Sequence, residues 1–208
     1  MSVLIFIDTA EGQIKKASFE AMSYGAKVAE QLNTTAEGVI LGNVKADIPS
    51  LGKYGVKKIH HVTDEKLNQF DAQVYTKMIA QVVESSGNKI IIFSNNVDGK
   101  AIAPRLSVRL KAGLVSGAVA LPDTGNGFSV MKTVFSGKAF AQILLTTEIK
   151  IITLNQNSYK VAMGEGTADV ATFKTTIETG KVKVLKANMA SGEISLTEAD
   201  IVVSGGRG

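Results

Sequence analysis

The sequence predicts an α/β fold, a three-layer sandwich in which helices flank a mostly parallel sheet, with a small antiparallel excursion. Two observations carry this prediction. In the first two thirds of the chain, apolar runs of strand length alternate with amphipathic stretches of helix length, which is typical of a parallel sheet covered by helices. The 208 residues are 45% apolar, which is enough for one substantial core.

Short apolar runs rich in β-branched residues predict the parallel strands. We expect them at residues 2–8, 38–41, 58–62 and 89–94. A helix ending near Asn33 is predicted between the first two strands, because apolar residues there recur at three- and four-residue spacings and share one helix face. These residues are Ile14, Ala17, Ala21, Gly25, Val28 and Leu32. That face should pack on the sheet.

The second helix is predicted by its ends. Asp71 precedes a helical apolar pattern, and its carboxylate can accept hydrogen bonds from the N–H groups of the first turn. Gly87 follows the pattern and suits the left-handed conformation in which many helices end. We therefore expect a helix that starts after Asp71 and ends at Gly87.

The third helix carries Ile102, Leu106 and Leu110 at four-residue spacing. Pro104 interrupts this pattern, and proline is best tolerated in the first turn of a helix, where its missing N–H matters least. The expected start is therefore close to Gly99 or Lys100.

A change of pattern after the third helix predicts the antiparallel excursion. Residues 122–127 (Pro-Asp-Thr-Gly-Asn-Gly) have the composition of a turn, and residues 128–134 and 139–145 have the pattern of strands. Residues 149–154 are apolar enough for a buried strand of the main sheet, and residues 181–184 alternate as a half-solvated strand would.

Composition excludes several classes of protein. The chain has no cysteine, so disulfides, cysteine-ligated metals and thiol nucleophiles are absent. Its 23 basic and 19 acidic residues are interspersed and aromatic residues make up 6%, a pattern that does not favour nucleic-acid binding. No apolar stretch approaches the roughly 20 residues of a membrane span, and no basic leader precedes the first strand. We expect a cytoplasmic, bacterial protein without membrane insertion.

No catalytic motif is found, so we predict that the chain is not itself an enzyme. His60 and His61 are neighbours on a predicted strand and point to opposite faces, which favours structural or surface roles over a shared site. The sequence lacks the Gly-x-Ser-x-Gly pattern of a serine hydrolase. Residues 132–139 fail the phosphate-loop pattern, and Gly164 and Gly166 lack the third glycine of a dinucleotide fingerprint.

Residues 199–208 form a β-branched run followed by the glycine-rich stretch Ser-Gly-Gly-Arg-Gly. Such a run usually opens a strand-turn-helix unit, in which glycine lets backbone N–H groups approach a phosphate. By itself the pattern fits a glycine-rich chain end equally well. Polar residues before it suggest an interdomain connection, so we expect one domain over residues 1–196 and the entry to a second domain over residues 197–208.

Three segments together resemble the electron transfer flavoprotein α subunit. They are residues 98–106, residues 134–141 with 150–154, and residues 199–208. The resemblance spans the whole chain but reaches only the N-terminal domain of that family and the start of its second domain. Departures are Lys100 where an arginine is expected, and Ser136 and Lys138 in place of alanine and asparagine.

The resemblance implies an electron carrier with FAD as cofactor and a β subunit as partner. Its expected donors are flavoprotein dehydrogenases, typically acyl-CoA dehydrogenases, and a quinone-reducing acceptor would pass the electrons to the respiratory chain. This chain would be the docking scaffold, and its expected flavin contacts are Arg207 with Gly206 beside it. Two charge-assisted hydrogen bonds of about 1.5–3 kcal/mol each would give at best about millimolar to tens of micromolar affinity. The alternative is a stand-alone adenine-nucleotide binding module of the universal-stress type.

Overall fold

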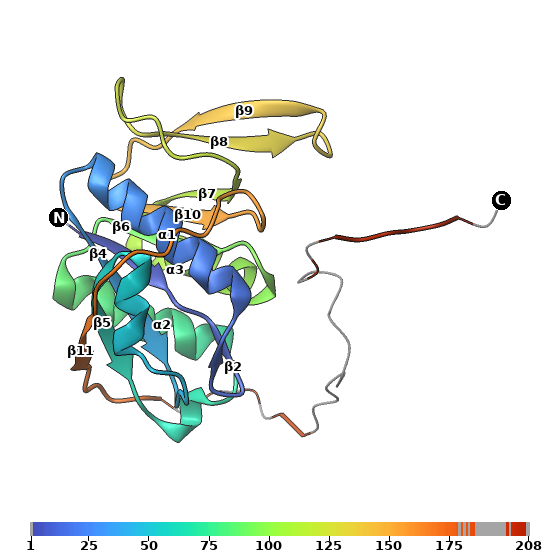
Figure 1. The fold of residues 1–208 in the computed structure, drawn as a ribbon. Helices are drawn as coiled ribbons and strands as arrows, with labels where there is room; N and C mark the ends of the chain where they lie inside the picture. Colours follow the sequence, from blue (N-terminus) through green and yellow to red (C-terminus); the bar gives the residue numbers. More distant parts are fainter. Residues whose placement is uncertain are drawn as a thin grey trace.

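The computed structural model describes residues 2–178, Gly180, Val182, Val184, Leu185, Ala199 and residues 201–206. Nine strands form one sheet in the order β11-β5-β4-β1-β6-β10-β7-β8-β9 (Figure 1). The parallel strands are β1 Ser2–Phe6, β4 Thr35–Leu41, β5 Val56–Val62, β6 Ile90–Ser94, β7 Gly113–Ala118, β10 Lys150–Leu154 and β11 Asp169–Thr172. β8 Ser129–Val134 and β9 Ala139–Leu144 run antiparallel to their neighbours, and β2 Thr9–Ala10 pairs with β3 Gln13–Ile14 in a separate small sheet.

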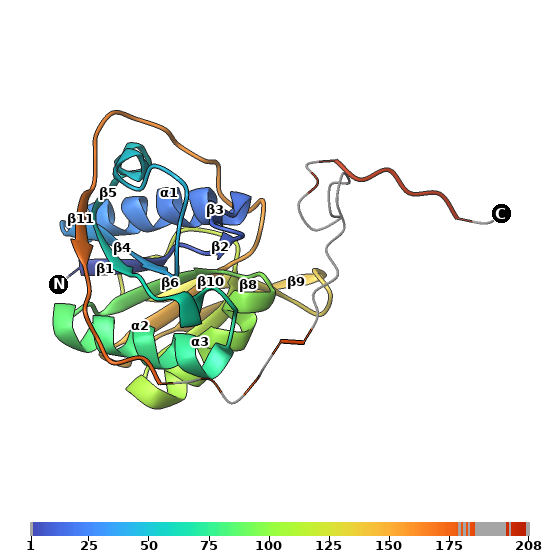
Figure 2. The ribbon, with the colours of Figure 1, turned by 90° about the horizontal axis from the view of Figure 1, so that it is seen from below.

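Helices cover both faces of the sheet, as predicted. α1 (Lys16–Gln31) lies on one face, and α2 (Ala72–Ser86) and α3 (Val97–Leu110) lie on the other (Figure 2). The alternation along β1 explains why both faces are apolar: Val3 and Ile5 belong to the core under α1, whereas Leu4 belongs to the core under α2 and α3. Two short 3-10 turns, η1 (Pro49–Tyr54) and η2 (Glu65–Leu67), complete the domain.

The strand order reverses direction next to β1. From β1 the chain builds outward through β4 and β5, then crosses back to place β6 on the other side of β1. In parallel sheets, ligands commonly bind at the carboxyl ends of the strands beside such a switch point. Here those ends lead into Asp8 after β1 and Asn96 after β6.

The predicted antiparallel excursion is confirmed. β8 and β9 form a hairpin at one edge of the sheet, and the chain then returns as the buried strand β10 between β6 and β7. The outermost strand on this side is β9, where four of six residues are exposed.

The predicted bounds of α2 are also confirmed. The Oδ1 atom of Asp71 accepts hydrogen bonds from the backbone N–H groups of Gln73 (2.8 Å) and Val74 (3.1 Å). Gly87 ends the helix with φ +70°, in the left-handed region.

The predicted start of α3 is wrong. The helix begins at Val97, so Pro104 lies inside it rather than in the first turn. Asn96 caps the earlier start, because its Oδ1 accepts a hydrogen bond from Gly99 N at 2.8 Å. Ile102 and Leu106 are fully buried on either side of the proline. Their packing against the sheet outweighs the roughly 3 kcal/mol by which proline disfavours a helix interior.

After β10, residues 155–178 pass over α1, add β11 beside β5 and continue onto the side of the sheet covered by α2 (Figures 1 and 2). β11 was not predicted, and it is the outermost strand at the sheet edge opposite to β9. The strand predicted over residues 181–184 falls partly outside the described residues, and Val182 and Val184 are exposed and belong to no strand. None of the helices among the described residues combines the length and hydropathy needed to cross a bilayer.

Candidate functional site

The described part of the chain offers five candidate sites: the glycine-rich segment, the histidine pair, a groove beside α1, the switch point of the sheet and the β8–β9 hairpin. Of the two predicted flavin contacts, Gly206 is described and Arg207 lies outside the described residues. Residues 201–206 are all exposed, and open space surrounds the positions where Cβ atoms would stand on Gly205 and Gly206. The backbone there is free for a ligand to approach, but no second element meets it within the described part of the chain.

His60 and His61 lie on β5 and contact different groups, as their neighbouring positions predict. His60 Nε2 lies 2.7 Å from Glu37 Oε2, whereas His61 Nε2 lies 2.8 Å from the carbonyl oxygen of Gly42. The hydrogen bond from His60 holds the pKa of the Glu37 carboxyl below its usual value. Within the described residues, no three His, Asp or Glu side chains gather closely enough to bind a metal ion.

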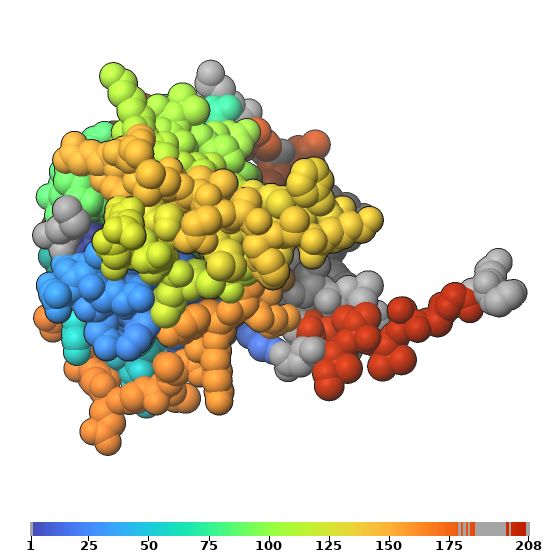
Figure 3. All heavy atoms as spheres, turned by 90° about the horizontal axis from the view of Figure 1, so that it is seen from above, coloured from blue at the N-terminus to red at the C-terminus, as the bar shows by residue number. Residues whose placement is uncertain are grey.

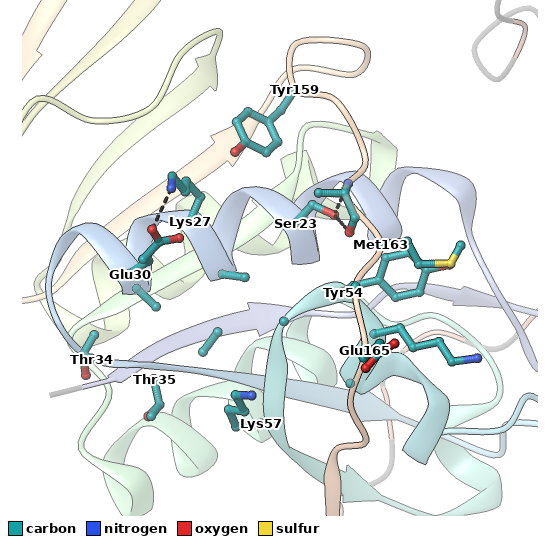
Figure 4. A pocket seen from close by; sticks show the side chains of 18 residues that line it. Ser23, Lys27, Glu30, Thr34, Thr35, Tyr54, Lys57, Tyr159, Met163 and Glu165 are labelled. Carbon is teal, nitrogen blue, oxygen red and sulfur yellow. Dashed lines mark hydrogen bonds and ion pairs between the residues drawn. The ribbon is translucent and has the colours of Figure 1, made fainter.

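A groove of about 530 Å³ runs between α1, η1 and the segment after β10 (Figure 4). Lys27 and Glu30 form an ion pair of 2.8 Å along its upper wall. Ser23 exchanges hydrogen bonds with the backbone of Ala162, donating to its oxygen and accepting from its N–H. These polar groups satisfy one another rather than converge on a substrate position, so the groove has the character of a seam between α1 and the segment that crosses it.

An ion cluster occupies the switch point. The ammonium of Lys15 lies 2.9 Å from Asp8 Oδ2 and 2.5 Å from Asp98 Oδ2. Asn96 Nδ2 also donates to Asp8 Oδ2 at 2.7 Å. The cluster therefore joins the end of β1, the start of α1 and the start of α3.

Burial and charge act in opposite directions on this cluster. Burial raises the pKa of Asp8, and the nearby Lys15 ammonium opposes that rise without cancelling it. Burial alone would lower the pKa of Lys15, but the charge of Asp8 and the hydrogen bonds to Asp98 and Asp8 raise it overall. Lys15 therefore stays protonated between the two carboxylates, and the cluster acts as an internal tie between elements.

The β8–β9 hairpin presents apolar side chains to solvent. It lies across the upper surface of the molecule (yellow in Figure 3), and Phe140 and Leu144 on β9 are 67% and 56% exposed. Phe135 at the hairpin turn is 80% exposed. Among the described residues no strand pairs with the outer edge of β9, which ends the strand order. An exposed apolar edge strand is a surface on which another chain can pair.

Two of these features were not predicted from the sequence. The ion cluster had a visible signal, since Asp8 ends one predicted parallel strand and Asp98 follows another, and the carboxyl ends of parallel strands meet at one side of a sheet. No signal in the sequence indicated that the β9 side chains are exposed, because an apolar strand pattern does not distinguish an edge strand from a buried one.

Comparison with known proteins gives a consistent result. A family model described as "Electron transfer flavoprotein domain" matches residues 3–178. The "Electron transfer flavoprotein subunit alpha" of Bacillus subtilis (strain 168) is 28% identical over 211 residues, a match that covers 99% of this chain and 64% of the relative. The protein of the same name from Syntrophomonas wolfei is 26% identical over 208 residues, covering 98% of this chain and 64% of the relative.

A third relative carries another name. The "Lactate dehydrogenase (NAD(+),ferredoxin) subunit LctC" of Acetobacterium woodii is 24% identical over 217 residues, covering 99% of this chain and 51% of the relative. This chain thus spans just under two thirds of the length of the α subunits above and about half of LctC.

Proposed function

The chain belongs to the electron transfer flavoprotein family, and from this premise we propose that it is the subunit-docking scaffold of the α subunit in an FAD-containing electron carrier. The match over residues 3–178, together with relatives named as α subunits, supports this proposal. Residues 1–196 form the docking domain, and residues 197–208 form the linker and entry to a flavin-holding domain. The scaffold itself transfers no electrons.

The surface that carries the docking role is the β8–β9 hairpin. Phe135, Phe140 and Leu144 expose apolar area that is costly to leave in water. The outer edge of β9 offers backbone N–H and C=O groups that a strand of the partner can pair with, which gives alignment as well as affinity. The partner is a β subunit of the same carrier.

FAD is proposed as the cofactor, with Gly206 and Arg207 as its contacts from this chain. Open space around Gly205 and Gly206 suits close approach of a pyrophosphate to the backbone. A guanidinium such as that of Arg207 makes charge-assisted hydrogen bonds to phosphate. These few contacts support the proposal that most of the affinity for FAD comes from residues beyond this chain.

The donors are proposed to be flavoprotein dehydrogenases, typically acyl-CoA dehydrogenases, with a quinone-reducing acceptor leading to the respiratory chain. The Acetobacterium woodii relative is itself named as a subunit of a lactate dehydrogenase (NAD(+),ferredoxin). The carrier is proposed to work in the bacterial cytoplasm.

The docking proposal is tested by charge substitutions on β9. Phe140→Asp and Leu144→Asp should each weaken binding of a cognate β subunit at least about tenfold, because a carboxylate would be buried in an apolar contact. Val108→Asp is the matched control, since Val108 is 81% exposed and belongs to α3, outside the β8–β9 hairpin. Isothermal titration calorimetry gives the affinities, and thermal melting verifies the fold. Unchanged binding by both β9 variants would remove the hairpin as the docking surface.

A further inference from the structure

A cavity of about 690 Å³ lies at the carboxyl ends of β1 and β4. Most of its walls come from three connections: residues 8–12 after β1, residues 41–45 after β4, and residues 67–70 at and after η2. The remaining lining residues are Lys15, Tyr75, Asp98 and Val184. The small β2–β3 sheet lies at this end of the molecule (Figure 1). Both the volume and the place, beside the switch point, are those of small-molecule sites in α/β proteins.

One part of the lining is apolar and aromatic. Leu41, Leu67, Phe70 and Tyr75 line it. The hydroxyl of Tyr75 already donates to the carbonyl oxygen of Leu67 at 2.6 Å, so this residue offers its ring rather than its polar group. Phe70 is 37% exposed and its ring centroid lies 5.1 Å from that of Tyr75. The two rings meet edge to face at 67°, so a flat heterocycle can pack on the partly exposed ring of Phe70, which Tyr75 supports from the side.

The charged part of the lining is unfavourable to anions. Its acidic residues are Asp8, Glu11 and Asp98, and its basic residues are Lys15 and Lys45. Lys15 is held between Asp8 and Asp98, so its charge is already compensated. The positive end of α3 is likewise occupied, because Asn96 caps it and Asp98 lies in its first turn. A phosphate placed here would meet more carboxylates than ammonium groups.

The same carboxylates favour ligands that donate hydrogen bonds. Each carboxylate oxygen has more than one lone pair, so Asp98 can accept further hydrogen bonds while it holds Lys15. The side chain of Asp98 is 17% exposed, and hydrogen bonds to a largely desolvated carboxylate are among the stronger ones.

We propose that this cavity binds an uncharged purine nucleoside, whose base packs on the ring of Phe70 and whose hydroxyl groups donate to the carboxylate of Asp98. The proposed ligand carries no phosphate group, because the carboxylates of the lining would repel a phosphate. The site is separate from the β8–β9 hairpin and from residues 201–206, so it does not depend on the docking role.

Adenosine is the probe, with AMP as its charged counterpart. Isothermal titration calorimetry and ¹⁵N-resolved NMR of the 208-residue chain should show adenosine binding, with amide shifts around residues 41–45 and 67–70. AMP should bind at least about tenfold more weakly, because its phosphate adds negative charge beside three carboxylates.

Two variants test the contacts, and circular dichroism verifies their fold. Phe70→Ala should weaken adenosine binding by about 5- to 100-fold, the range typical of losing one aromatic stacking partner. Asp98→Asn should weaken adenosine binding at least about tenfold, and it should bring the affinities for adenosine and AMP closer together. Val108→Ala, at an exposed position of α3 outside the lining of the cavity, is the control and should bind adenosine as the wild type does. The proposal is overturned if adenosine fails to bind at millimolar concentration, if AMP binds more tightly, or if Phe70→Ala has no effect.

Discussion

At the scale of single residues, Glu20 is the clearest case of one side chain organising a long segment. Glu20 lies on α1 and is 7% exposed. Its carboxylate accepts hydrogen bonds from the backbone N–H groups of three successive residues after β10: Asn157 at 3.0 Å, Ser158 at 2.8 Å and Tyr159 at 2.8 Å. Successive N–H groups that surround one anion form a nest, filled here by a carboxylate of the protein itself.

Replacing Glu20 should therefore destabilise the fold. We expect Glu20→Ala to lower the free energy of unfolding by about 2–4 kcal/mol, because the partly buried N–H groups of Asn157 and Tyr159 lose their acceptor and that of Ser158 keeps only a longer hydrogen bond to the oxygen of Asn155. Glu20→Gln keeps one acceptor oxygen, so its free energy of unfolding should fall by about half as much. Urea unfolding monitored by circular dichroism measures both. A Glu20→Ala variant as stable as the wild type would show that the nest adds little.

The contact between His60 and Glu37 predicts a dependence of stability on pH. The folded-state pKa of Glu37 lies below its usual value of 4.5. The ionised Glu37 carboxylate therefore adds to the stability of the fold above pH 4.5, and this stabilisation is lost as the pH falls through the lowered folded-state pKa. The stability difference between wild type and Glu37→Gln should therefore shrink as the pH falls from neutral to about 3. Urea unfolding over this range provides the test. A difference that stays constant or grows on acidification would contradict the assigned shift.

At the scale of elements, local chemistry explains what could be predicted and tertiary contacts explain the rest. The ends of α2 follow from Asp71 and Gly87, whose roles depend on their own side chain or backbone. The start of α3 could not be placed, because burial of Ile102 and Leu106 offsets the preference of Pro104. β11 could not be predicted either, since Asp169–Thr172 is a short and largely exposed segment that becomes a strand through its pairing with β5.

The candidate sites also include some residues that the sequence could predict and others that depend on tertiary structure. Gly206 and Arg207 were predicted as flavin contacts from a family resemblance. Gly206 is exposed, and Arg207 lies outside the described residues. The apolar edge of β9 and the cavity beside the switch point both depend on strand order. Strand order is a long-range property that periodicity along one segment does not contain.

The docking of β11 depends on a close approach at Gly52. A Cβ atom at this position of η1 would lie 2.2 Å from the carbonyl carbon of Thr167 and 2.5 Å from the nitrogen of Ala168. Both are backbone atoms next to β11, so they cannot move aside as a side chain could. Gly52→Ala should therefore displace this segment and speed hydrogen exchange of the β11 amides relative to those of β10.

Gly205→Ala is the control for this prediction, because nothing lies within 4 Å of the added Cβ atom. Its exchange rates in β11 should equal those of the wild type. If Gly52→Ala also left the β11 amides unchanged, the close packing of η1 against residues 167 and 168 would be refuted.

At the scale of the whole molecule, the two edges of the sheet differ in a way that fits a docking scaffold. One edge ends in β11, a strand of four residues in which Val170 is 41% exposed, whereas the other ends in β9, a strand of six residues in which Phe140 and Leu144 are 67% and 56% exposed. Long exposed edges invite uncontrolled pairing unless they are covered. The longer and more apolar edge at β9 is the one that a permanent subunit contact would use, and the β subunit proposed above is a partner of that kind.

The central claim is that this chain docks a second subunit without holding the flavin by itself. The most direct measurement is the visible flavin absorbance per mole of the 208-residue chain, recorded alone and after co-purification with a cognate β subunit in the presence of FAD. We predict an equimolar complex of the two proteins, with much less than one flavin per chain when the chain is purified alone. Stoichiometric FAD on the isolated chain, or failure to form the complex, would contradict the account.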